Sequence, residues 1–176
     1  MVWVALGIGS NIHPLQNISQ CLDALLLQFN DLNFSSVFES EAVGFDGDNF
    51  LNMVVSMQTD MPLQKLIAVL KKIEDDFGRD RTQAKFSGRT MDIDILVYGD
   101  TTGKHEGIEL PRPEISENAY VLWPLSQLAK QQRHPLLGQT YAELWDKYDK
   151  SKQILWPIDF TWHGRIISAR GDAIRG

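Results

Sequence analysis

The sequence predicts an α+β fold whose first hundred residues run strand, helix, strand, strand, helix, strand. Two observations lead to this prediction. In several short stretches apolar and polar residues alternate, as in half-buried strands. In two longer stretches apolar residues recur every three or four positions, as in amphipathic helices. The order βαββαβ is found in the ferredoxin-like sandwich, and 176 residues suit one compact domain.

Each element of this order has its own local signal. Val2, Val4 and Leu6 alternate in an opening strand, and Pro14 suits the first turn of a helix. Further strands are predicted over residues 34–40, 50–58 and 90–98, and a second helix follows Pro62. The apolar stripes of the two helices are Leu15, Ile18, Leu22, Leu25, Leu26 and Phe29, and then Leu63, Leu66, Ile67, Leu70, Ile73 and Phe77.

Successive side chains of a strand point to opposite faces of the sheet, so alternate residues of the third and fourth predicted strands share a face. In the third strand, Leu51, Met53, Val55 and Met57 share one face, and Phe50, Asn52, Val54 and Ser56 share the other. In the fourth strand, Asp92 and Asp94 share one face, and Met91, Ile93, Ile95 and Val97 share the other.

The sequence after residue 98 predicts additional C-terminal helices. Residues 110–113 are extended because two prolines disfavour helix in the residues before them. A helix over 116–129 is expected to be shortened or kinked at Pro124. A capping box from Thr140 to Glu143 starts a helix that ends near Tyr148. We therefore expect a domain over 1–150 and a C-terminal extension over 151–176, which packs on the core, covers the site or forms a dimer contact.

The composition argues against nucleic-acid-binding, membrane-spanning and disulfide-bonded proteins. Asp and Glu number 23 against 17 Lys and Arg, for a net charge of -6, so a general nucleic-acid-binding protein is not expected. No apolar run approaches the roughly 18 residues that span a bilayer, and residues 1–6 lack a basic leader. Cys21 is the only cysteine, which excludes an internal disulfide. We expect a cytoplasmic protein without a membrane partner.

The acidic pair Asp92 and Asp94 is the most informative motif. Aspartate is depleted in strands, so two on one face are either a solvated outer face or a site for a divalent cation. Carboxylate oxygens suit Mg²⁺, which shares its coordination shell with water and substrate phosphates. Arg79, Arg81 and Arg89 lie just upstream in a long polar stretch, and guanidinium groups bind phosphate oxygens. Together these residues favour transfer from a nucleoside triphosphate.

A wider set of motifs resembles the 6-hydroxymethyl-7,8-dihydropterin pyrophosphokinases of folate biosynthesis. In order, the motifs are Gly9-Ser10-Asn11, Phe50-Leu51-Asn52, Ile73-Glu74, Gly78-Arg79-x-Arg81, Gly88-Arg89-Thr90-x-Asp92-x-Asp94-Ile95-Leu96, Leu110-Pro111 and Val121-Leu122-x-Pro124-Leu125. The resemblance covers about residues 1–150. It implies a ferredoxin-like core, ATP with two Mg²⁺ ions, and transfer of pyrophosphate to the pterin hydroxymethyl group with release of AMP.

The resemblance also implies roles for individual residues. Asp92 and Asp94 would hold the metal ions, and Arg79 and Arg89 would be catalytic residues that contact the phosphates. The ATP side would comprise Glu74, Arg81, Ile95 and Arg112. The pterin side would comprise Ser40, Val43, Gly44, Phe50, Asn52 and Tyr120, with the two aromatic rings flanking the flat pterin.

Some positions differ from the family pattern. Arg112 stands where the family has His, Asn118 where it usually has Arg, and Ser40 where Thr is usual. Because guanidinium stays protonated at neutral pH, Arg112 cannot act as an acid or base there. Two alternatives therefore remain open: a paralogue that acts on a related pterin, and a non-catalytic pterin-binding protein.

Overall fold

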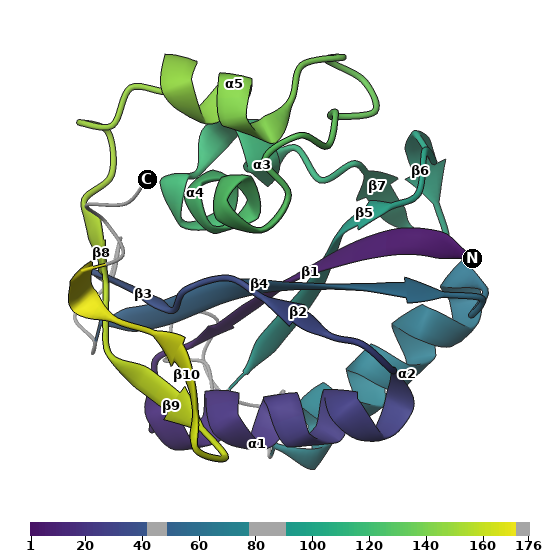
Figure 1. The fold of residues 1–176 in the computed structure, drawn as a ribbon. Helices are drawn as coiled ribbons and strands as arrows, with labels where there is room; N and C mark the ends of the chain where they lie inside the picture. The colour runs from purple at the N-terminus through teal and green to yellow at the C-terminus, as the bar shows by residue number, and fades with distance from the viewer. Residues whose placement is uncertain (42–48, 78–90, 172–176) are drawn as a thin grey trace.

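In the computed structural model, one antiparallel sheet lies between two layers of helices (Figure 1). The structure describes residues 1–41, 49–77 and 91–171. Helices α1 (Pro14–Gln28) and α2 (Leu63–Asp76) cover one face of the sheet. Helices α3 (Glu114–Glu117), α4 (Ala119–Leu128) and α5 (Tyr141–Lys147) lie on the other side. The α+β class expected from the sequence is confirmed.

The order of the strands matches a ferredoxin-like sheet. Within the described ranges, the main sheet runs β5-β1-β4-β3-β8, with β2 paired to β4 beside β3. Its strands are β1 (Val2–Ser10), β2 (Asn33–Phe34), β3 (Phe38–Ser40), β4 (Phe50–Thr59), β5 (Asp92–Tyr98) and β8 (Leu155–Pro157). Two hairpins accompany it, made by β6 (Gly103–His105) with β7 (Ile108–Leu110) and by β9 (Phe160–Trp162) with β10 (Arg165–Ser168). The first strand is therefore an inner strand, with β4 on one side and β5 on the other.

The sheet has a hydrophobic core on each of its two faces. The core under α1 and α2 contains the predicted inward set of β4, with Met53 1% exposed, together with Ile93 and Ile95 of β5. The core under α4 contains Val54 and Ala5 from the opposite face. The two faces predicted for β4 are confirmed, because period-two alternation continues through the whole strand.

Two strand predictions need correction. The single strand expected over 34–40 is two short strands, β2 and β3, separated by residues 35–37. Ser35 N donates to Val54 O at 2.9 Å, but the acceptor for Val54 N is the Ser35 hydroxyl, also at 2.9 Å. Val97 does not share a face with Ile95, since the register of β5 against β1 shifts between Ala5 and Leu6. This irregularity transfers Val97 to the core under α4.

The helix expected over 116–129 is also interrupted, but not at Pro124. Pro124 lies inside α4. The break between α3 and α4 is at Asn118, whose backbone is extended (φ -119°, ψ 124°). Pro124 is the sixth residue of α4 and has no N–H to donate to Tyr120 O four residues earlier, yet the helix continues to Leu128. The capping box is confirmed in part, because Thr140 Oγ1 accepts a hydrogen bond from Glu143 N at 3.1 Å.

The final segment adds to both the sheet and the core. Strand β8 pairs with β3, and the β9–β10 hairpin lies beside α1 (Figure 1). Trp162 is 7% exposed and packs with its ring 5.5 Å from that of Phe34. Its Nε1 donates a hydrogen bond to Asp23 Oδ1 of α1 at 2.9 Å. Of the three roles considered for residues 151–176, packing on the core is the one that these contacts support.

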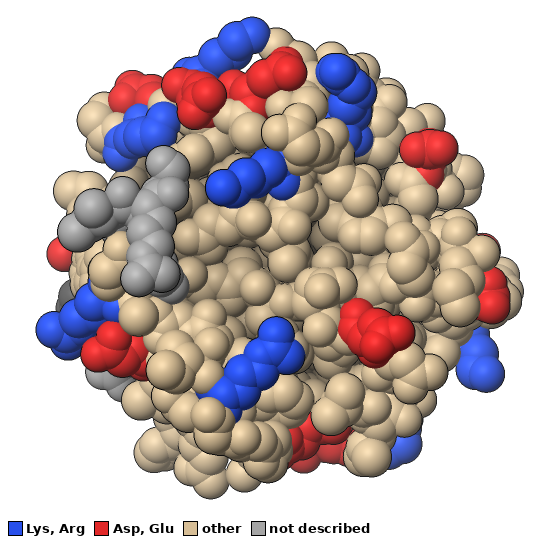
Figure 2. Space-filling view, viewed as in Figure 1, with Lys and Arg blue, Asp and Glu red and all other residues tan. Residues whose placement is uncertain are grey.

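The face seen in Figure 2 shows side chains of both charges around its rim and mainly uncharged residues across its middle. Among the described residues, no helix is long and apolar enough to cross a membrane.

We predict that Trp162→Ala lowers the free energy of unfolding by about 3–5 kcal/mol, since it removes a buried aromatic ring and a hydrogen bond to α1. Urea denaturation followed by circular dichroism measures this change. The control is Ile166→Ala in the same hairpin, where the side chain is 74% exposed; it is expected to change stability by less than about 0.5 kcal/mol. Equal stabilities for the two variants would contradict a core role for the hairpin.

Candidate active site

One row of residues crosses four neighbouring strands at the end of the sheet where β1 finishes. Phe38 of β3 pairs with Asn52 of β4, Asn52 pairs with Gly9 of β1, and Gly9 pairs with Asp92 of β5. Residues that oppose one another across strands point to the same face. The amide expected to contact the pterin and one expected metal ligand therefore share a face, on either side of a glycine.

Gly9 makes this row possible. A Cβ atom built on Gly9 would lie 2.7 Å from Asn52 Oδ1, a distance at which one of the groups must shift. The Asn52 side chain therefore lies over the backbone of β1. The sequence motif pointed to Gly9, but the reason for a glycine there is visible only once β1 and β4 are paired.

The two acids lie on the predicted face of β5. Asp92 is half-buried and Asp94 is exposed, whereas Ile93 and Ile95 on the opposite face are 6% and 4% exposed. Among the described residues, no cluster of three or more His, Cys, Asp or Glu side chains could hold a metal ion. A pair of carboxylates with solvent access fits Mg²⁺, which keeps water ligands and takes further oxygens from phosphates.

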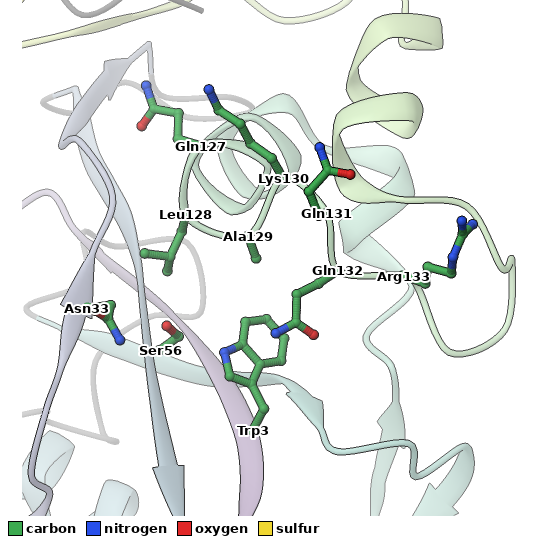
Figure 3. Close-up of a pocket in the computed structure, with 10 residues that line it drawn as sticks. All are labelled: Trp3, Asn33, Ser56, Gln127, Leu128, Ala129, Lys130, Gln131, Gln132 and Arg133. Atoms are coloured by element: carbon green, nitrogen blue, oxygen red, sulfur yellow. The ribbon is translucent and has the colours of Figure 1, made fainter.

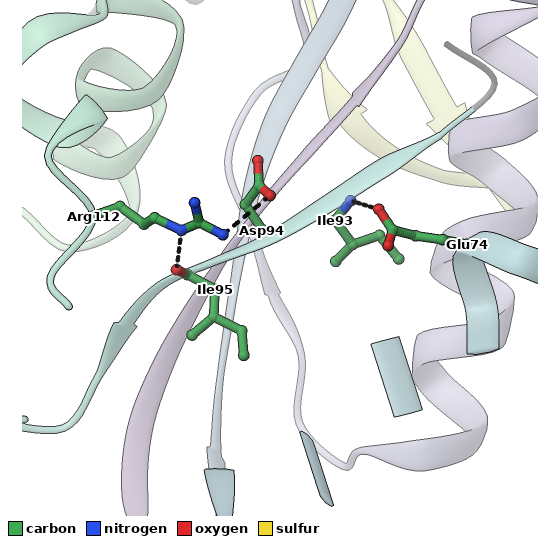
Figure 4. Close-up of polar contacts among 5 residues, drawn as sticks. All are labelled: Glu74, Ile93, Asp94, Ile95 and Arg112. Carbon is green, nitrogen blue, oxygen red and sulfur yellow. Dashed lines mark hydrogen bonds and ion pairs between the residues drawn. The ribbon is translucent and has the colours of Figure 1, made fainter. Parts of the chain in front are cut away.

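Glu74 and Arg112 bind the backbone of β5, which is the edge strand of the sheet (Figure 4). Glu74 Oε2, at the end of α2, accepts a hydrogen bond from Ile93 N at 3.0 Å. Arg112 Nε donates to Ile95 O at 3.2 Å, and Arg112 N donates to Leu96 O at 2.9 Å. Backbone groups of an edge strand need such partners, so both residues fix the strand that carries the acids.

Arg112 also forms an ion pair within the candidate site. Its Nη2 lies 3.4 Å from Asp94 Oδ1, and the two side chains are 27% and 56% exposed. At this exposure the pair contributes little to stability. Its effect is local, because it places one positive charge beside an acid that is expected to contact the metal ion. The Ile95 side chain is packed in the core, so its accessible group at this place is the backbone carbonyl.

The described residues of the expected pterin side come from three elements. Ser40 of β3 pairs with Phe50 of β4, next to the pair of Phe38 with Asn52. Tyr120 lies in the first turn of α4 and is half-buried. Burial raises the pKa of Tyr120, and the negative charges of Glu114 and Asp94 raise it further.

Other expected site residues fall outside the described ranges. These are Val43 and Gly44 on the pterin side and Arg79, Arg81 and Arg89 on the phosphate side. Their roles therefore stay predictions. The described part of the site consists of the acids, the amide, the two aromatic residues, Ser40 and the residues that bind the edge of β5.

A separate pocket of about 840 Å³ lies at the opposite end of the sheet (Figure 3). Its lining includes Trp3 and Ser56, which are several residues along β1 and β4 from Gly9 and Asn52. The Gln132 side chain points toward the Trp3 indole, and Lys130 and Arg133 are at the rim. None of the expected site residues lines this pocket.

Sequence reasoning missed two polar groups near the start of α4. Glu114 Oε2 is buried without a hydrogen-bond partner among the described residues. Gln153, which lies beyond the region of resemblance, donates a hydrogen bond to Asn118 Oδ1 at 2.8 Å. No local pattern signals the burial of Glu114 or the bond from Gln153, because each depends on the packing of segments that are distant in the sequence.

Known proteins resemble this chain over most of its length. A family model described as 7,8-dihydro-6-hydroxymethylpterin-pyrophosphokinase (HPPK) matches residues 5–130. The 2-amino-4-hydroxy-6-hydroxymethyldihydropteridine pyrophosphokinase of Aquifex aeolicus is 34% identical over 147 residues, which are 81% of this chain and 90% of that protein. The protein of the same name from Bacillus subtilis is 32% identical over 130 residues, covering 72% of this chain and 77% of that one.

A solved structure extends the likeness to the fold. The crystal structure of Plasmodium falciparum HPPK-DHPS with pteroate matches with a TM-score of 0.72 at 14% identity, covering 94% of this chain and 47% of that one. The chain thus spans about half the length of that protein, and at this identity the match establishes the fold alone. The family model and the two relatives place this chain in the 7,8-dihydro-6-hydroxymethylpterin-pyrophosphokinase family.

Proposed function

We propose that this chain transfers pyrophosphate from ATP to the hydroxymethyl group of 6-hydroxymethyl-7,8-dihydropterin, releasing AMP, as a step of folate biosynthesis. The observation that carries the proposal is the row in which Asn52 and Asp92 flank Gly9 on one face of the sheet. Two strand spacings, about 10 Å, separate their backbones. This span suits a small acceptor and a metal-bound triphosphate that meet above β1.

The acceptor side consists of one amide and two aromatic rings. Asn52 would hydrogen-bond the edge of the pterin, and Phe50 and Tyr120 would flank its faces. Flat heteroaromatic ligands are commonly bound by stacking on rings, with a few polar groups that fix their orientation. Ser40 pairs directly with Phe50 and belongs to the same wall. Val43 and Gly44 would complete that wall.

The donor side consists of the acids and the arginines. Asp92 and Asp94 would hold two Mg²⁺ ions, which when bound neutralise the charge of the triphosphate. Arg79 and Arg89 would contact the transferred phosphates, with Arg81 and Arg112 supplying further positive charge. Glu74 and Ile95 would lie on the nucleotide side, where their contacts with the backbone of β5 and with Arg112 hold the strand in place.

In the reaction, the hydroxymethyl oxygen of the pterin attacks the β-phosphorus of ATP. A new bond forms between that oxygen and phosphorus, and the bond from the β-phosphorus to the bridging oxygen of the α-phosphate breaks. AMP leaves with the electron pair of the broken bond, and the hydroxyl proton passes to water. This chain's residues contribute mainly position and charge, as in phosphoryl transfer generally. Since Arg112 remains a cation at neutral pH, it contributes charge and not proton transfer.

ATP and the pterin are the proposed partners, and a cytoplasmic location follows from the proposed pathway. The division at residue 150 stays a prediction, although β8 contributes a strand to the main sheet.

The proposed reaction is tested by incubating the purified protein with ATP, Mg²⁺ and the dihydropterin and then separating the nucleotides. We expect AMP and the pterin diphosphate in equal amounts. Turnover of a different pterin alone would favour the paralogue, and pterin binding without ATP affinity would favour the non-catalytic alternative. Folded protein that makes no AMP would contradict the proposal.

We predict that Asp94→Ala lowers kcat by about 10²–10³-fold, because it removes an acid proposed to hold the metal and leaves Arg112 without its carboxylate partner. Steady-state AMP production measures the effect, with circular dichroism to verify the fold. The matched control is Asp100→Ala, an exposed acid just beyond β5, which should keep the parent rate. A near-parental rate for Asp94→Ala would rule out its metal role.

A second prediction concerns the glycine between acid and amide. Gly9→Ala adds a methyl carbon that would lie 2.7 Å from Asn52 Oδ1, so the amide must move. We expect the KM for the pterin to rise about ten- to a hundredfold, in line with the cost of small misplacements in a site. In the control, Gly7→Ala, the new Cβ meets Leu96 Cδ2 at an ordinary 3.4 Å, and the KM should change less than about threefold. Similar KM values for both variants would contradict the role of Gly9.

A further inference from the structure

Residues 148–157, which we call the connecting segment, touch two elements that carry proposed pterin-side residues. At its start, Tyr148 Oη donates a hydrogen bond to Glu117 O at 2.9 Å, where α3 ends. At its end, β8 pairs with β3, placing Leu155 opposite Ser40 and Pro157 opposite Phe38. The segment therefore links the start of α4 to the strand at the far side of the proposed pterin pocket.

Gln153 is the residue of this segment that binds the start of α4. Its Oε1 accepts a hydrogen bond from Ala119 N at 2.7 Å, and its Nε2 donates to Asn118 Oδ1 at 2.8 Å. The N–H groups in the first turn of a helix have no partner within the helix. The Asn118 side chain provides no cap of its own for α4. Gln153 supplies that missing acceptor from 34 residues away.

The residue after this cap is one that we propose to contact the substrate. Ala119 is fully buried, and the next residue is Tyr120, which is proposed to flank the pterin. Asn118 is the point where the backbone turns from α3 into α4. Two hydrogen bonds from one side chain on consecutive residues fix the direction in which α4 starts. The orientation of Tyr120 relative to β3 depends on that direction.

We infer that Gln153 is a positioning residue for the pterin: through Asn118 and Ala119 it holds Tyr120 at the distance from β3 that the substrate requires. This inference rests on the proposed function and adds a role for a residue outside the region that resembles the family. The hydrogen bonds of Gln153 are to Asn118 and Ala119, directly before Tyr120, so we expect it to act on the binding of the acceptor.

The test is steady-state kinetics of Gln153→Met, which keeps the side-chain length and removes both hydrogen bonds. We expect the KM for the pterin to rise about five- to tenfold, while kcat and the KM for ATP change less than about twofold. Gln131→Met is the matched control, because Gln131 is an exposed glutamine at the distant pocket; its constants should equal those of the parent.

Two further variants separate positioning from general stability. Gln153→Glu keeps an acceptor for Ala119 N and should show an intermediate KM. Asn118→Leu removes only the hydrogen bond from Gln153 Nε2 and should also show an intermediate KM. The double variant Asn118→Leu/Gln153→Met should be no worse than Gln153→Met, since that single variant already removes both hydrogen bonds. Parental KM for Gln153→Met, or a fall in kcat with unchanged KM, would overturn the inference.

The outcome for the parent protein separates this inference from the proposed function. If the parent makes no AMP but binds the pterin in calorimetry, the proposed reaction fails; weaker binding by Gln153→Met alone would then still support the positioning role. If the parent does not bind the pterin at all, both fail.

Discussion

The close approach of Asn52 to the backbone of Gly9 is the contact on which the arrangement of the site depends. Strand β1 is an inner strand, and at Gly9 it contributes no side chain between β4 and β5. The amide on one side and Asp92 on the other can therefore face the same space. A larger residue at this position would fill that space and displace the amide, since its Cβ alone would come within 2.7 Å of Asn52 Oδ1.

A second constraint is the open edge of the sheet. Among the described strands, β5 pairs with β1 alone, and its outer backbone groups need partners. Glu74 and Arg112 provide them at Ile93 N and Ile95 O, while Arg112 also reaches Asp94. The residues expected on the nucleotide side thus also have a structural role, because they hold the strand on which both acids lie. The guanidinium of Arg112 suits that role, since it has several hydrogen-bond donors.

Local sequence patterns predicted most of the fold and part of the site. Periodicity placed α1, α2 and the two faces of β4, and it put both acids of β5 on one face. It failed where a long-range contact determines the structure. The irregular pairing of β1 with β5 moved Val97 to the other face, and the break at Asn118 depends on a partner at Gln153. The pairing of β8 with β3 joins segments more than a hundred residues apart, which no local window contains.

Acceptor and metal-bound nucleotide are proposed to meet above Gly9, between Asn52 and the acids. A crystal structure of this chain with the dihydropterin, Mg²⁺ and a non-hydrolysable ATP analogue tests this proposal most directly. We expect the pterin edge within hydrogen-bond distance of Asn52, its ring between Phe50 and Tyr120, and metal ions on Asp92 and Asp94. A pterin bound in the pocket beside Trp3, or metal ions away from both acids, would contradict it.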